Sequence, residues 1–161
     1  MKSIFTLIAF TTILASLSVS TSVAQIEQPH SFILEATGTA YDRQNNPTNI
    51  DLSLEGYGFG TLSRIMWLRV DSGNMKVGTG TFRIVGGQGL LTQSAHYIYL
   101  VIRITPLYGG TVTACYMRGT TDDPTDSEIP LSLSSRYLIL PTPPRITILR
   151  NLQLTGEITL T

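Results

Sequence analysis

The residues best suited to contact a ligand lie in one predicted β-hairpin, between positions 97 and 118. Its outgoing arm, 97–104, is rich in aromatic and β-branched residues, and its even-numbered positions are all aliphatic. Because side chains alternate between the two faces of a strand, we expect the even positions to be buried and the odd positions to form a second face. Aromatic rings with a polar tip, beside cationic side chains, suit sugars and flat ligands. The candidate ligand-binding residues on this second face are Tyr97, Tyr99, Arg103, Tyr116 and Arg118.

Two glycines predict how the arms of this hairpin pair. The dipeptide Gly109-Gly110 supplies the positive φ angles of a tight turn. If these two residues form the turn, Ile104 faces Cys115 and Arg103 faces Tyr116. Both arms then place their apolar residues on one face, so we expect Cys115 to be a buried, unreactive thiol.

Metal-binding side chains are few and poorly spaced. A blue-copper site needs two histidines, a cysteine and usually a weak methionine ligand. The chain contains His30, His96, Cys115 and Met117, but no histidine follows Cys115 closely, as such a site requires. Zinc lacks a ligand pair at useful spacing. We therefore expect no metal cofactor and no other cofactor.

One loop concentrates carboxylates, within residues 122–128. Its acidic residues are Asp122, Asp123, Asp126 and Glu128. Extracellular calcium sites use such oxygen donors, but the loop has no EF-hand spacing and no glycine at a sharp turn. The pattern favours a solvated acidic loop, with weak Ca²⁺ binding as the alternative.

Patterns for catalysis are weak. A Ser–His–Asp triad would have to use His96, yet the chain has no Gly-x-Ser-x-Gly elbow. Glu35 and Glu157 would form a carboxylate pair if the terminal strands paired, but both alternate with threonines on a polar face. The glycine run at 56–60 lacks a nucleotide-binding fingerprint. The sequence leans against an enzyme and assigns no catalytic residue; a hydrolase or isomerase is the alternative.

The N-terminal segment, residues 1–24, has the pattern of a secretory signal peptide. Lys2 precedes an apolar stretch at 4–17, and Ser22-Val23-Ala24 provides small residues for cleavage. We expect a secreted or extracytoplasmic protein, with an uncleaved N-terminal anchor as the alternative. No later apolar run is long enough to span a membrane as a helix.

Composition limits the partners. The chain of 161 residues carries 11 basic and 11 acidic residues, and only 14% of its residues are charged. Such a chain has no strong overall field to attract nucleic acid or anionic lipid. One cysteine cannot form an internal disulfide, so the hydrophobic core alone must stabilise the domain.

The remaining pattern is that of an all-β domain. Strand-like segments lie at 32–42, 50–55, 62–70, 75–85, 90–92, 97–104, 111–118, 129–133 and 137–140, and a final segment begins at 146–149 and alternates through 152–160. Roughly nine or ten short strands with short links predict a single antiparallel meander. Glycine-rich stretches at 78–80 and 86–89 indicate bends or bulges. The first and last strands resemble each other, and their pairing would close the sheet into a barrel; a two-sheet β-sandwich is the alternative.

These observations divide the chain into a signal peptide (1–24), a flexible leader (25–31) and an all-β domain (32–161). The predicted function is non-catalytic binding or a structural role outside the membrane, with a small apolar or aromatic ligand on the tyrosine face. The alternative is a surface or assembly module that self-associates through a sheet face or edge. A barrel of about eight strands has a lumen that is either filled or holds one small ligand, so its contents decide where a ligand can bind.

Overall fold

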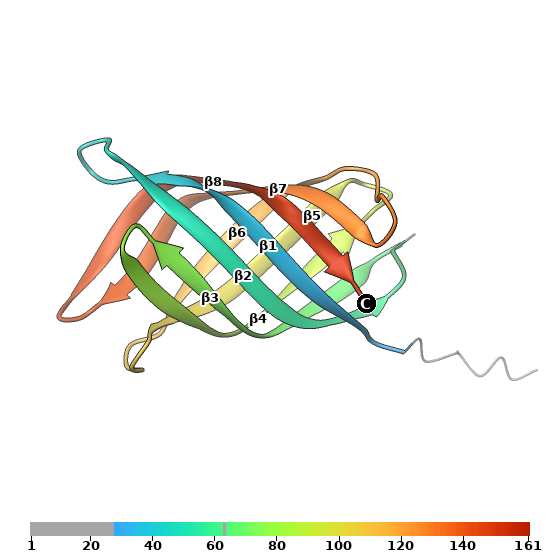
Figure 1. Ribbon diagram of the computed structural model, residues 1–161, viewed down its shortest axis with the longest axis horizontal. Coiled ribbons are helices and arrows are strands. Elements are labelled where there is room, and N and C mark those ends of the chain that lie inside the picture. Colours follow the sequence, from blue (N-terminus) through green and yellow to red (C-terminus); the bar gives the residue numbers. More distant parts are fainter. Residues whose placement is uncertain (1–27, 63) are drawn as a thin grey trace, which may run out of the picture.

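The computed structural model describes residues 28–62 and 64–161, and these residues form a β-barrel (Figure 1). The predicted signal peptide lies outside the described residues. The strands are β1 (His30–Tyr41), β2 (Pro47–Gly60), β3 (Met66–Val77), β4 (Gly80–Thr92), β5 (Tyr97–Pro106), β6 (Thr113–Thr121), β7 (Glu128–Thr142) and β8 (Arg145–Leu160). No helix in the described part of the chain is long and apolar enough to cross a membrane.

The eight strands form one closed antiparallel meander. Each strand pairs with the next one in the sequence, and β1 pairs with β8 to close the barrel. In this closing seam Glu35 faces Glu157, and Thr37 faces Thr155. The predicted closure by the terminal strands is therefore confirmed, and the sandwich alternative is wrong. Figure 1 shows the strands winding obliquely around the long axis, with β1 beside β8.

The structure has eight long strands where the sequence predicted nine or ten shorter ones. The predicted turn at Asp71–Asn74 lies inside β3, where Asp71 forms a β-bulge between the pairs Glu55–Ser72 and Gly56–Val70. A bulge absorbs an extra residue and bends the strand without ending it. The chain turns instead at Gly78, whose φ is 57°.

Other predicted strands are also joined. The segment 90–92 continues β4, while 129–133 and 137–140 are parts of β7. The final predicted segment, which begins at 146–149 and continues through 152–160, corresponds to β8. At the other end, β1 includes the last two residues of the predicted leader. Polar residues or glycines interrupt the hydrophobic pattern at these points, but the strand residues on both sides of each interruption stay paired with a neighbouring strand.

Hydrophobic side chains fill the interior of the barrel. All eight strands contribute buried residues at alternating positions, and most of these residues are Leu, Ile, Val or Met. In the hairpin, the even positions Ile98, Leu100, Ile102 and Ile104 are each 0% exposed, as the pattern predicted. Burying each such side chain stabilises the fold by roughly 1.5–3 kcal/mol. The filled interior leaves the outer wall and the barrel ends as the surfaces that can bind ligands.

The predicted register of the β5–β6 hairpin is wrong by two residues. Ile102 faces Cys115, and Arg103 faces Ala114 rather than Tyr116. The loop spans residues 107–112, instead of a two-residue turn, and begins with a hydrogen bond from the Gly109 N–H to the Pro106 carbonyl (2.9 Å). A shift of two residues keeps every side chain on its face, so the predicted burial of both arms holds.

Candidate binding site on the outer wall

The five predicted ligand-binding residues all lie on β5 and β6. Because Ile98, Leu100 and Met117 fill the interior, the alternating tyrosines and arginines point away from it. Any ligand held by these residues binds from outside the barrel.

A groove on this outer wall contains three of the five predicted residues. It has a volume of about 290 Å³ and is lined by Tyr99, Tyr116, Arg118, Ser134, Ser135, Arg136, Asn151 and Gln153. We call it the Tyr–Arg groove. Tyr99 and Arg118 face each other across β5 and β6, and Ser134 and Gln153 continue the same row across β7 and β8.

An irregularity between β7 and β8 brings two further residues into the groove. The regular pairs Ser135–Leu152 and Tyr137–Arg150 flank the site, while Arg136 and Asn151 lie between them without regular pairing. The φ angle of Asn151 is 50°, in the left-handed region that asparagine adopts more readily than most residues. Two arginines therefore line the groove, one from β6 and one from β7.

Short polar contacts fix the groove on the β7 side. The Ser134 hydroxyl donates to the Arg118 carbonyl at 3.2 Å, and the Ser135 hydroxyl donates to the Tyr137 carbonyl at 2.8 Å. The guanidinium carbon of Arg136 lies 5.3 Å from the centre of the Tyr137 ring, a cation–π distance. Aromatic surface, cations and neutral hydrogen-bonding groups thus share one groove.

Arg103 lies in a neighbouring depression of about 410 Å³, which Gly87, Gln88 and Val101 also line. We call it the Arg103 depression. Val101 faces Tyr116 of the Tyr–Arg groove, so the two sites are adjacent. Tyr97 lines neither site.

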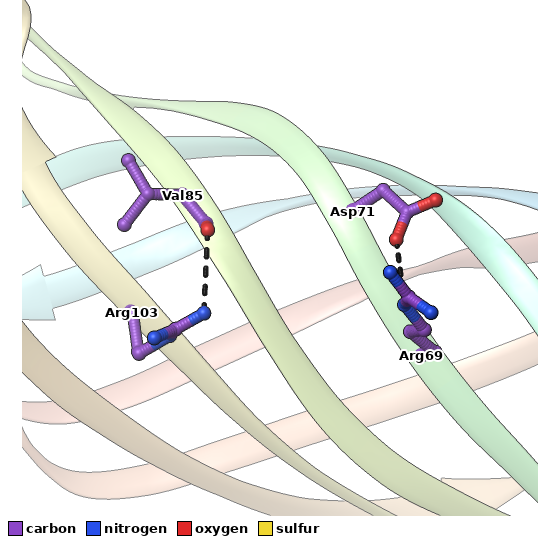
Figure 2. Close-up of polar contacts among 4 residues, drawn as sticks. All are labelled: Arg69, Asp71, Val85 and Arg103. Atoms are coloured by element: carbon purple, nitrogen blue, oxygen red, sulfur yellow. Dashed lines mark hydrogen bonds and ion pairs between the residues drawn. The ribbon is translucent and has the colours of Figure 1, made fainter.

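A β-bulge holds Arg103 in place. On β4, Val85 and Gly86 are inserted between the residues that face Ile104 and Ile102, so two residues oppose Arg103. Figure 2 shows the Arg103 guanidinium donating to the Val85 carbonyl, at 3.5 Å. The bend predicted from the glycines at 86–89 is therefore confirmed here, where Gly86 has a φ of 135°.

At the bulge in β3, by contrast, the arginine is paired with a carboxylate. Arg69 forms an ion pair with Asp71 (Nε to Oδ1, 3.0 Å), also drawn in Figure 2. Within residues 28–62 and 64–161, no carboxylate lies within ion-pair distance of Arg103, Arg118 or Arg136. These three guanidinium groups keep their charge available to a ligand.

The residues considered for catalysis have few reactive groups around them. His96 lies on a turn with a φ of 47°; its Nδ1 is 3.1 Å from the Thr121 carbonyl and its Nε2 is 4.0 Å from an Asp123 carboxylate that is 91% exposed. Glu35 and Glu157 do face each other, and both are exposed on the outer wall. No nucleophile contacts His96 among the described residues.

The candidate metal ligands are dispersed. The described residues contain no group of three or more His, Cys, Asp or Glu side chains arranged to hold a metal ion. The four loop carboxylates, Asp122, Asp123, Asp126 and Glu128, are exposed and belong to no such group. Burial raises the pKa of the Cys115 thiol to about 12, against a weaker effect of its hydrogen bond with Ser135, so this thiol stays protonated at neutral pH.

Two other depressions differ in character from the Tyr–Arg groove. One, of about 470 Å³, lies over the β1–β8 seam and mixes the carboxylates Glu35 and Glu157 with Lys76. The other, of about 340 Å³, lies at the barrel end and includes the apolar residues Met66 and Leu160. We call the latter the barrel-end depression.

A row of outward-facing apolar residues, two of them exposed and two half-buried, leads across the wall to the groove. Phe59, Trp67, Leu90 and Tyr99 face one another in order across β2, β3, β4 and β5. Trp67 is 60% exposed and Phe59 is 42% exposed. We call these four residues the aromatic row. The sequence reasoning did not single out this row, because it depends on the register of three hairpins.

Sequence reasoning also missed the half of the groove on β7 and β8. A signal was present, since the predicted strands broke at 134–136 and at 150–151, the two places where the irregularity occurs. Opposite breaks in adjacent strands could have indicated a local opening.

Comparisons of the chain with protein-family models, with curated proteins and with solved structures found no match.

Proposed function

We propose that this protein is an exported, non-catalytic binding module that holds a ring-shaped ligand in the Tyr–Arg groove. The observation that carries the proposal is the composition of the groove. Two tyrosine rings, two arginines and neutral hydroxyl and amide groups converge there, on the outer wall of a barrel whose interior is filled. Rings bind by stacking on tyrosine, and their polar substituents bind to the surrounding donors and acceptors.

The absence of a convergent acid–base pair around the groove favours binding over catalysis. Its described lining contains no His, Cys, Asp or Glu. A general acid or base must lie within hydrogen-bond reach of the reacting atom. The lining of the groove supplies aromatic, guanidinium, hydroxyl and amide groups, which suit recognition of a ligand.

An NMR titration tests this proposal. We would add p-nitrophenyl β-glucoside, which combines a sugar with an aromatic ring, to ¹⁵N-labelled protein and follow the amide shifts. We expect shifts centred on Tyr99, Tyr116 and Ser134, and unchanged ligand on recovery. Tyr116→Ala should weaken binding at least about fivefold, because an aromatic contact of about 1 kcal/mol is lost. The control Tyr57→Ala, on β2 and 44% exposed, should bind as the parent does.

The same titration separates the alternatives. Shifts centred on Met66 and Leu160 would move the ligand to the barrel-end depression, and hydrolysis of the glucoside would indicate an enzyme; either result contradicts the proposal. The remaining alternative is self-association through a sheet face, because the closed barrel leaves no unpaired edge strand among the described residues. The exposed rings of Phe59 and Trp67 in the aromatic row favour that alternative. A dimer in size-exclusion chromatography that Trp67→Ala dissociates, with no groove shifts, would support it instead.

A further inference from the structure

The charged residues of this barrel are segregated by wall. The outward charges on β4, β5, β6 and β7 are Arg83, Arg103, Arg118 and Arg136, and the only carboxylate in these strands is Glu128, the first residue of β7. β1 and β2 carry Glu35, Asp51 and Glu55, with no lysine or arginine. The balanced total charge therefore conceals one basic and one acidic wall.

The arginines of the basic wall lie in two adjacent sites. Arg118 and Arg136 line the Tyr–Arg groove, and Arg103 lines the neighbouring depression. Tyr116, which is 61% exposed, stands at their shared boundary, because it faces Val101 of the Arg103 depression. From the rise of about 3.4 Å per residue, Arg103 lies about 14 Å along the strand direction from the row that contains Arg118. This distance accommodates more than one sugar ring.

We propose that the ligand of this wall is an acidic glycan, whose negative groups bind Arg103, Arg118 and Arg136 while a sugar ring stacks on Tyr116. The inference rests on the proposed function of the Tyr–Arg groove and names the class of its ligand. A guanidinium group matches carboxylate or sulfate in a two-bonded geometry. The five neutral side chains of the two sites, Gln88, Ser134, Ser135, Asn151 and Gln153, complement sugar hydroxyl groups.

The wall suits a glycan better than a nucleic acid. Single-stranded nucleic acid requires a dense cationic groove along its backbone and aromatic rings for successive bases. The basic wall has isolated arginines, no lysine in β4–β7 and one strongly exposed tyrosine at the boundary of the two sites. Neutral hydrogen-bonding groups outnumber the cations, as hydroxyl-rich ligands require.

Calorimetry with matched oligosaccharides tests the inference. The probes are hexagalacturonate, its fully methyl-esterified form and a heparin-derived hexasaccharide. We expect the ester to bind at least about tenfold more weakly than hexagalacturonate, because charge-assisted hydrogen bonds to arginine are lost. Preference for hexagalacturonate identifies carboxylates as the acidic groups, and preference for the heparin fragment identifies sulfates.

Charge-matched variants locate the contact. Arg103→Gln, Arg118→Gln and Arg136→Gln should each weaken binding of the acidic hexasaccharide about fivefold and reduce its salt dependence. Arg69→Gln removes the same charge from a residue already paired with Asp71, and it should leave the affinity unchanged.

Three results would overturn the inference: equal affinity for the acidic and esterified probes, equal losses in Arg69→Gln and in the three test variants, or tighter binding of a single-stranded oligothymidylate than of either glycan. If the acidic and esterified probes bind with equal affinity and still shift the amides of the groove, the proposed binding function stands and only the acidic-glycan inference fails. Shifts outside the groove, or none with any probe, would remove both proposals.

Discussion

At the scale of single residues, burial decides which side chains can react. Cys115 carries a nucleophilic sulfur atom, but its side chain is 0% exposed in the barrel interior and is hydrogen-bonded to Ser135. The same alternation that buries this thiol exposes Tyr116 and Arg118 on either side of Met117. Chemistry on this strand therefore belongs to its outward residues.

The raised pKa of Cys115 predicts a specific pH dependence of stability. The unfolded chain loses the thiol proton near the ordinary pKa of 9.0, whereas the folded protein keeps it to about 12. A group whose pKa is raised by folding contributes stability below pH 9, and that contribution is lost as the pH rises from 9 to 12. At pH 10 the free energy of unfolding should have fallen by about 1.4 kcal/mol through this group alone.

Urea denaturation at pH 8 and pH 10 measures this loss, with Cys115→Ala as the control. Every other group is the same in the two proteins, so the difference between them isolates the thiol. Identical pH dependence in the two proteins would show that the thiol ionises freely in the folded state.

At the scale of elements, irregularities in long strands shape the proposed binding surface. The bulge at Val85 and Gly86 turns a carbonyl toward Arg103, and the unpaired position at Arg136 and Asn151 opens the Tyr–Arg groove. Regular strands would present a continuous row of side chains at these places. The local sequence therefore determines where the wall is hollowed.

The closing seam between β1 and β8 predicts that the protein is sensitive to a side chain at Gly156. A Cβ atom there would collide with the Glu35 carbonyl oxygen and the backbone of Ala36 on the adjacent strand. Gly156→Ala should destabilise the protein by about 2–3 kcal/mol, as overpacking does, whereas the neighbouring exposed Thr155→Ala should cost less than about 1 kcal/mol. Urea denaturation gives both values, and hydrogen exchange should show the loss in β1 and β8 amides. A Gly156→Ala protein as stable as Thr155→Ala would contradict the seam geometry.

The sequence predicted the faces of the strands better than their lengths. Alternation at 97–104 assigns the buried face correctly, because the preference for apolar burial is local and repeats at every second residue. Strand ends at Asp71–Asn74 and register at Gly109-Gly110 were wrong, because they depend on the partner strands. For the same reason the shared outer face of the tyrosines and arginines of one hairpin was predictable, whereas the position of Arg136 beside them was not.

At the scale of the whole molecule, closure of the barrel places the first and last strands side by side. Ser31 and Thr161 are hydrogen-bonded neighbours, with the Thr161 N–H donating to the Ser31 carbonyl at 2.9 Å. Figure 1 shows the start of β1 and the C-terminus at the same end of the barrel. The order of the strands along the chain therefore matters less than their order around the barrel.

A circular permutant tests this conclusion. The variant begins at Gly110, links Thr161 to Gln28 through a short Gly/Ser linker and ends at Gly109, so it opens the exposed 107–112 loop. We expect the same strand content and the same amide shifts within the Tyr–Arg groove, with a stability loss below about 2 kcal/mol from the altered loop closure. Circular dichroism and NMR spectra provide the measurement, and an unfolded permutant would show that chain order is essential.

The position of the two ends has a mechanical consequence. A partner protein or surface attached at Ser31 or Thr161 holds the barrel at one end. The loop that carries the fully exposed Tyr108 then lies at the opposite rim, because this loop follows β5 and an odd number of antiparallel strands takes the chain to the far side. The wall with the Tyr–Arg groove faces sideways in this arrangement. A long polymer can therefore lie along that wall without passing through the barrel and without ending at the groove.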